Sequence, residues 1–204
     1  MKKLTFILFA ATFVSCTSND TFNKEIAQFR HEYKNAFITD ERSPLKAEDT
    51  SYLRFYTPDP TYKVKASFEL TPESTPFDIP TVSGKTKQYR QYGIATFSIN
   101  DTVQKLHIYQ SLKLMQAPEY AEHLFIPFTD ATSYIETYGG GRYIDLSIDD
   151  IKGTGLIIDF NKCYNPWCAF AEGYNCPIPP PENRLSVAIR AGELNYGKPH
   201  DSEH

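Results

Sequence analysis

The stretch Tyr62-Lys63-Val64-Lys65-Ala66-Ser67-Phe68-Glu69-Leu70 decides the fold class, because apolar and polar residues alternate along its whole length. Such alternation is typical of a half-buried β-strand, whose successive side chains point to opposite faces. Two more strands are predicted at residues 89–99 and 103–109, and the residues between them, Asn100-Asp101-Thr102, are typical of a hairpin turn. This part of the chain is therefore predicted to form an antiparallel sheet.

Further short strands are predicted on both sides of this hairpin, at residues 53–56, 77–82, 124–128, 142–148, 154–160 and 184–190. No helical segments alternate with them, which excludes a parallel, doubly wound sheet. The 14 Tyr and 14 Phe residues of the 204-residue chain also favour strands. We predict a mainly β domain of the α+β class, an antiparallel barrel, roll or sandwich of about eight strands.

An amphipathic helix is predicted at residues 22–38, before the first strand. Its apolar residues recur at steps of three or four and share one helical face: Phe22, Ile26, Phe29, Tyr33 and Phe37. The helix should end near Thr39-Asp40, shortly before Pro44. We expect this face to pack on the domain's own sheet; the alternative is a face that binds a partner.

The N-terminus has the features of an export signal. Lys2 and Lys3 precede an apolar run at residues 4–14, which is too short to span a bilayer. The sequence Phe13-Val14-Ser15-Cys16 that follows resembles the lipobox of bacterial lipoproteins. This resemblance implies a signal peptide at residues 1–15, a lipid on Cys16 and attachment to a membrane of the cell envelope. A plain secretory signal is the alternative.

The remaining chain is predicted to contain a polar tether at residues 16–21, one globular domain at residues 22–194 and a disordered tail at residues 195–204. The formal charge of −4 becomes −6 once Lys2 and Lys3 are removed with the signal peptide. An acidic protein without clustered Lys and Arg does not bind nucleic acid, because phosphate contacts depend on such clusters.

Four motifs in the C-terminal third carry a family resemblance. They are Leu124-Phe-Ile-Pro-Phe-Thr-Asp-Ala-Thr132, Thr137-Tyr-Gly-Gly-Gly-Arg-Tyr-Ile-Asp145, Asp159-Phe-Asn-Lys-Cys-Tyr-Asn-Pro-Trp-Cys168 and Cys176-Pro-Ile-Pro-Pro-Pro-Glu-Asn-Arg184. In this order they resemble the bacterial and archaeal family catalogued as domain of unknown function 1684, over roughly residues 20–194. The resemblance implies a shared domain and no established activity.

The second motif suggests an anion site. Consecutive glycine amides at Gly139, Gly140 and Gly141 can form an anion-binding nest, and Arg142 could hold a carboxylate or phosphate with two hydrogen bonds. The alternative is a simple hairpin turn in which Arg142 pairs with Asp145 or Asp159. We predict that Tyr138, Asp159 and Glu182 join the glycines and Arg142 around one cavity, which binds a small anionic or polar ligand.

Glu182 is the candidate catalytic residue, since the proline run before it would hold it rigidly and a buried Glu can act as a general base. An ion pair with Arg142 or Arg184 is the plainer interpretation. Three functions remain open. The first is a ligand-binding or interaction module of the cell envelope, and the second is a hydrolase- or lyase-type enzyme that uses Arg142 and Glu182 on an anionic substrate. The third, a structural envelope protein, needs only the anchor.

Three cysteines remain once Cys16 carries lipid. The family resemblance matches Cys168 and Cys176, which implies a disulfide between them and a free Cys163. The cysteine spacing lacks the fourth ligand of a zinc site. We therefore expect neither a metal nor a cofactor.

Overall fold

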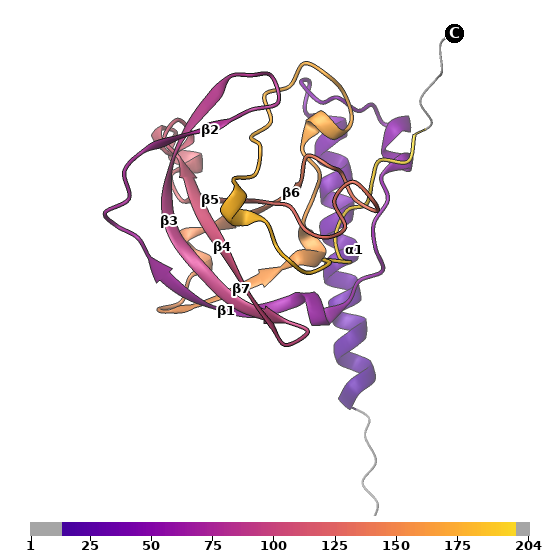
Figure 1. Ribbon diagram of the computed structural model, residues 1–204. Helices are drawn as coiled ribbons and strands as arrows, with labels where there is room; N and C mark the ends of the chain where they lie inside the picture. Colours follow the sequence, from indigo (N-terminus) through magenta and orange to yellow (C-terminus); the bar gives the residue numbers. More distant parts are fainter. Residues whose placement is uncertain (1–13, 199–204) are drawn as a thin grey trace, which may run out of the picture.

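The computed structural model describes residues 14–198 and confirms a mainly β protein with one N-terminal α-helix (Figure 1). Most of the predicted signal peptide and the end of the predicted tail, residues 1–13 and 199–204, lie outside the described residues. Short 3-10 helices lie at Glu48–Tyr52 (η1), Pro60–Tyr62 (η2), Leu114–Gln116 (η3), Pro118–Tyr120 (η4), Ile148–Asp150 (η5), Phe160–Lys162 (η6), Trp167–Ala169 (η7) and Pro181–Asn183 (η8).

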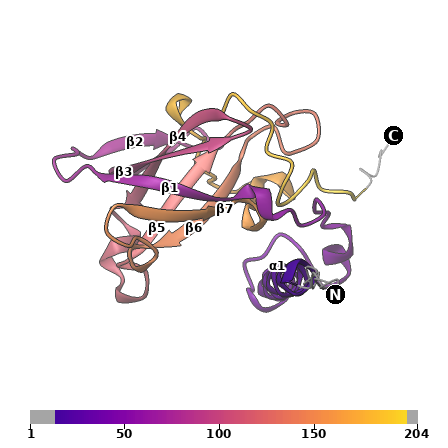
Figure 2. The same ribbon diagram turned by 90° about the horizontal axis from the view of Figure 1, so that it is seen from below.

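Seven strands form one antiparallel sheet that curls into a half-barrel, as Figures 1 and 2 show. They are β1 (Lys63–Leu70), β2 (Phe77–Pro80), β3 (Thr86–Ile99), β4 (Thr102–Ser111), β5 (His123–Phe128), β6 (Arg142–Ser147) and β7 (Gly155–Asp159). The spatial order is β6-β5-β4-β3-β1-β7, and β2 pairs with one end of β3. Residues 14–198 therefore form neither a closed barrel nor a two-sheet sandwich, but one curled sheet.

The hairpin of β3 and β4 turns where the sequence predicted. Ile99 pairs with Thr102, and the two residues between them, Asn100 and Asp101, have φ of +48° and +59°. Two left-handed residues give a turn whose twist matches that of the strands. This hairpin provides the longest ladder of the sheet.

The alternation of the strands places the main core on the concave face. On β1, Val64, Ala66 and Phe68 are buried, while the lysines and Glu69 between and after them are directed outward. They belong to one cluster with residues from the other strands and with Phe160 and Ile189 from the segments that close the open side. A curled sheet alone leaves this side open, so irregular chain completes the core.

The helix α1 (Val14–Thr39) begins eight residues before the predicted start and ends at the predicted Thr39. Residues 16–21 are therefore helical and do not form a separate tether, since no Pro or Gly interrupts residues 14–39. The predicted apolar face packs on the domain, with Ile26 and Phe37 buried and Glu25 between Lys63 and Lys162. Figure 2 shows α1 nearly end-on beside the half-barrel. Within residues 14–198, no helix has the length and apolar character needed to cross a membrane.

Two predicted strands do not form, and part of the predicted disordered tail is packed on the domain. Residues 53–56 and 184–190 are irregular and make only the single bridges Phe55↔Glu193 and Thr129↔Arg184. The carbonyl of Ile189 instead accepts a hydrogen bond from a side chain, that of Arg142. Residues 195–198 pack on the domain, where Tyr196 contacts Phe170.

Candidate functional site

The Arg142 side chain is a structural group inside the protein. Its guanidinium is 1% exposed and donates to the Asp130 carboxylate at 2.7 Å and to the carbonyls of Ile189, Ala191 and Glu193 at 2.8, 2.6 and 3.2 Å. The predicted partners Asp145 and Asp159 are wrong, because Asp130 provides the carboxylate. With these bonds made inside the core, Arg142 cannot anchor a ligand.

Asp130, which Arg142 holds in place, also bonds the loop that follows it in the chain. Its Oδ1 accepts hydrogen bonds from the backbone N and the hydroxyl of Thr132, at 2.7 and 2.6 Å. The carbonyl of Thr132 in turn accepts from the amides of residues 135, 136 and 137. The buried ion pair therefore fixes a compact turn at residues 130–137.

This turn presents Tyr134 to solvent. Tyr134 has φ of +69°, a left-handed conformation that bulky residues rarely adopt, and it is 85% exposed. The next residue, Ile135, is 76% exposed. Strained backbone that displays large apolar side chains is the kind of feature that marks binding sites.

The glycines make room for tyrosine rings. A Cβ at Gly139 would overlap the ring of Tyr134, and a Cβ at Gly140 would overlap the ring of Tyr138. Gly141 has φ of +88° and lies against the carbonyl of Phe128. Aromatic rings therefore pack against one side of Gly139 and Gly140, and the predicted anion nest stays a prediction. Tyr134, Tyr138, Gly139 and Gly140 are called the tyrosine platform below.

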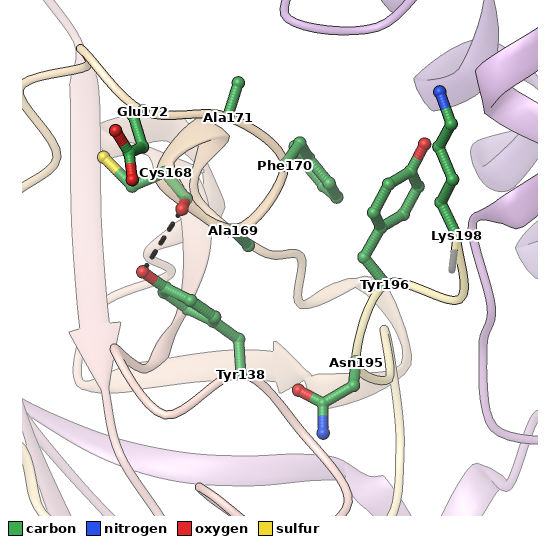
Figure 3. Close-up of a pocket in the computed structure, with 9 residues that line it drawn as sticks. All are labelled: Tyr138, Cys168, Ala169, Phe170, Ala171, Glu172, Asn195, Tyr196 and Lys198. Carbon is green, nitrogen blue, oxygen red and sulfur yellow. Dashed lines mark hydrogen bonds between the residues drawn. The ribbon is translucent and has the colours of Figure 1, made fainter. Parts of the chain in front are cut away.

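Two hollows border the platform and share Tyr138. The first, of about 760 Å³, is lined by Ser133, Tyr134, Tyr138, Gly139, Ile178 and Arg184, among others. The second, of about 650 Å³, is lined by Tyr138, Phe170, Glu172, Asn195, Tyr196 and Lys198, among others (Figure 3). The Tyr138 hydroxyl donates a long hydrogen bond to the carbonyl of Cys168, at 3.4 Å.

Glu182 and Asp159 lie elsewhere, so the predicted shared cavity is wrong. Glu182 is exposed on η8 and accepts a hydrogen bond from the Tyr109 hydroxyl at 2.9 Å. Asp159 ends β7, accepts from the amide of Asn161 and faces Lys63 at 3.8 Å. Neither residue lines a hollow of the platform. Of the predicted ligand-binding residues, Tyr138, Gly139 and Gly140 remain at the site.

The cysteines have the predicted arrangement. Cys168 and Cys176 form a disulfide with their Cα atoms 6.2 Å apart, and Cys163 is a buried free thiol. Burial raises the pKa of Cys163 to about 11, which is the opposite of nucleophile activation. The disulfide closes the loop that carries Phe170 and Glu172, and so shapes one wall of the second hollow.

Asn183 explains the motif that contains Glu182. Strands β4 and β5 pair only at Tyr109↔Phe125. The buried amide of Asn183 bonds the amide and carbonyl of His107 on β4 and the carbonyl of Pro127 on β5. The motif therefore joins two splayed strands. Across residues 14–198, no three His, Cys, Asp or Glu residues are grouped so that they could hold a metal ion.

Asp130 and Tyr134 were not among the predicted site residues. A local signal for Asp130 exists in Thr129-Asp130-Ala131-Thr132, since an Asp two residues before a Thr commonly bonds the following backbone. Tyr134 gave no such signal, because its φ and exposure depend on contacts with Thr137 and Gly139.

Comparison with known proteins gives a family and a solved relative. Residues 49–194 match the family described as protein of unknown function (DUF1684). The solution NMR structure of an uncharacterised protein of Haloarcula marismortui is similar, with 29% sequence identity and a TM-score of 0.67 over 92% of this chain and 99% of that one. No curated protein matches. The family match spans most of the chain, and the protein therefore belongs to the family of unknown function DUF1684.

Proposed function

We propose that this protein is a binding module of the cell envelope, attached to a membrane by a lipid on Cys16, with the tyrosine platform as its ligand site. One observation carries the proposal: Tyr134 is 85% exposed in a left-handed conformation, held by an internal hydrogen-bond network. A loop backbone that is fixed before binding loses little conformational entropy when a ligand covers its side chains.

The membrane attachment is supported by the N-terminal sequence. Lys2 and Lys3, the apolar residues 4–14 and Ser15-Cys16 occur in the order of a lipoprotein signal. Several acyl chains at one terminus hold a protein firmly to a bilayer, whereas a single chain does not.

The alternative of an enzyme finds no support in the residues that suggested it. Arg142 is committed to carbonyls and to Asp130, and Glu182 is an exposed residue that accepts from Tyr109. General acid–base catalysis needs its groups around one reacting atom, and these two residues share no hollow. A binding module requires only the platform.

The charges around the platform favour an uncharged polar ligand over an anion. Lys198 of the second hollow pairs with Asp49 at 2.7 Å, and Arg190 beside the turn pairs with Glu136 at 2.9 Å. Of the described residues, Arg184 is the one basic residue that lines the first hollow, and the Asp130 carboxylate beside it is buried against Arg142. The basic side chains that residues 14–198 place along the two hollows are thus paired or single, and they form no cluster that would attract an anion.

Retention on envelope material tests the proposal. The mature lipoprotein, kept in mild detergent, is mixed with the insoluble envelope material that remains after detergent has removed the membranes. We expect it to be retained, and Tyr134→Ala and Tyr138→Ala to elute early, because each removes a ring of the platform. The control is Tyr120→Ala, which removes an exposed tyrosine on η4 outside both hollows. Equal retention of all variants, or no retention of the unchanged protein, would contradict the proposal.

A further inference from the structure

The platform also indicates a ligand class. Resting on the proposed function of this site, we infer that its ligand is an uncharged saccharide chain that lies across Tyr138 from one hollow to the other. The inference depends on the aromatic rings, the polar groups between them, the internally bonded backbone and the shared position of Tyr138.

The first observation is the set of aromatic side chains. Tyr134 and Tyr138 border the first hollow, and Tyr138, Phe170 and Tyr196 border the second. The face of an aromatic ring is negative, so it attracts the weakly positive C–H groups that cover one face of a sugar ring. Figure 3 shows Tyr138 on one side of the second hollow, with Phe170 and Tyr196 on the other.

The second observation is the polar groups between the rings. Ser133 and Arg184 line the first hollow, and Glu172 and Asn195 line the second. A hydroxyl, a guanidinium, a carboxylate and an amide supply both donors and acceptors, which sugar hydroxyls need around their edges. A few polar groups among apolar walls are typical of a site that fixes the orientation of a small ligand.

The third observation argues against a peptide. Peptides commonly bind as an added strand, through unpaired backbone groups. Here the amide of Tyr134 bonds the carbonyl of Thr137, and the amides of residues 135, 136 and 137 bond the carbonyl of Thr132. The amide of Gly141 bonds the carbonyl of Tyr138. The loop thus offers side chains to a ligand, while these backbone donors are already satisfied.

The fourth observation concerns length. Both hollows fall within the range of about 300–1,000 Å³ that small-molecule sites occupy. Because Tyr138 borders both, a ligand that fills only one hollow leaves the other empty. Affinity should therefore rise with chain length until both hollows are filled.

Titration with cello-, chito- and malto-oligosaccharides, from the disaccharide to the hexasaccharide, tests the inference. Trp167 is the only tryptophan of the chain and belongs to η7, whose Cys168 and Ala169 line the second hollow, so its fluorescence reports binding. We expect one series to bind, with the hexasaccharide about tenfold or more tighter than the disaccharide. Tyr138→Ala should weaken the hexasaccharide about tenfold or more, which corresponds to about 1.4 kcal/mol. Tyr138→Phe keeps the ring and should bind nearly as well as the unchanged protein, as should the control Tyr120→Ala.

A second arm separates this inference from the proposed function. Envelope material is treated with anhydrous trifluoromethanesulfonic acid, which cleaves glycosidic bonds and leaves peptide bonds intact, or with protease. Loss of Tyr138-dependent retention after the acid alone supports a saccharide. Loss after protease alone, with no oligosaccharide bound, overturns the saccharide and leaves the binding module intact. Retention that does not depend on Tyr138 overturns both.

Discussion

At the residue scale, the pair of Arg142 and Asp130 controls the shape of the platform from inside the protein. Both side chains are 1% exposed and their atoms approach to 2.7 Å. Asp130 also bonds Thr132, so the same carboxylate neutralises the arginine and fixes the turn that carries Tyr134. A motif with the chemistry of an anion site thus acts on the proposed ligand site indirectly.

We predict that Arg142→Ala lowers the free energy of unfolding by about 3–5 kcal/mol, because it leaves the charge of Asp130 buried and unpaired. Urea denaturation of the purified protein measures this. Arg190→Ala is the control, since Arg190 is 59% exposed in its pair with Glu136 and such surface pairs contribute about 1 kcal/mol or less. Similar, small losses for both variants would mean that Arg142 does not hold the turn.

Glu193 is the second buried group with a measurable consequence. It is 0% exposed and accepts hydrogen bonds from the Tyr33 hydroxyl of α1 at 2.9 Å and from the amide of Asn165 at 2.8 Å. Burial raises the pKa of Glu193 from 4.5 to about 8. Oε1 of Glu193 is buried without a hydrogen-bond partner, so an ionised carboxylate would be poorly stabilised at this position.

This shift predicts that stability falls with rising pH. Between about pH 4.5 and about pH 8 the folded protein keeps the Glu193 proton and the unfolded chain has released it. The contribution of Glu193 to the free energy of unfolding should therefore fall by about 1.4 kcal/mol per pH unit in this range and level off above it. Urea denaturation from pH 5 to pH 9 should show a flatter profile for Glu193→Gln, which cannot ionise. Parallel profiles for the two proteins would exclude this origin.

At the element scale, α1 offers a matched pair of isoleucines. Ile26 is 0% exposed against the domain, and Ile38 is 52% exposed on the same helix. We expect Ile26→Ala to lower the free energy of unfolding by about 2–5 kcal/mol through the lost burial and the cavity that remains. Ile38→Ala should change it by less than about 0.5 kcal/mol. If the two substitutions had equal effects in urea denaturation, α1 would not be docked.

The disulfide loop gives a further test at this scale. A bridge that closes the loop from Cys168 to Cys176 should stabilise the fold by about 2–3 kcal/mol in the chain-entropy account. Reductant should therefore lower the thermal midpoint of the protein, and it should leave the Cys168→Ala/Cys176→Ala double variant unchanged. If reductant lowered the thermal midpoint of both proteins equally, the destabilisation would not come from this disulfide. Loss of the bridge should also loosen the wall of the second hollow that contains Phe170.

The strands show what local sequence can predict. The alternation at residues 62–70 and the turn at residues 100–101 predicted β1 and the hairpin of β3 and β4, since side-chain direction and turn conformation are local properties. Residues 184–190 also alternate, with Leu185 and Ile189 buried, yet they form no strand. Alternating apolar and polar residues show only that one face of the segment is buried. A β-strand also needs a neighbouring strand with which its backbone can form hydrogen bonds.

The candidate site was predictable only in part, for the same reason. The glycine motif marked the right loop, because closely approached backbone requires glycine. The role of Arg142 depends on carbonyls about fifty positions further along the chain, at Ile189, Ala191 and Glu193. No local pattern contains that information. Chemistry that suits a ligand equally suits a buried network, and burial decides between them.

At the scale of the whole molecule, the proposed anchor is tested directly. Cys16→Ala removes the thiol that would carry the lipid and should move the protein from the membrane fraction to the soluble envelope fraction. Fractionation and mass spectrometry of the N-terminal peptide measure this. An unlipidated peptide in the unchanged protein, with the same fractionation as the variant, would refute the anchor.

The unbroken helix α1 would make the proposed attachment stiff. Its axis rises about 32 Å between Cys16 and Phe37, at about 1.5 Å per residue. Phe37 contacts Phe170, so the second hollow lies at the end of the helix remote from Cys16 (Figure 1). A flexible tether would let the distance between the anchor and the hollow vary, whereas a rigid helix keeps this distance nearly constant. The hollow would then meet ligands by lateral diffusion in two dimensions, and ligands farther from the bilayer than the helix reaches would not be bound however well they fit.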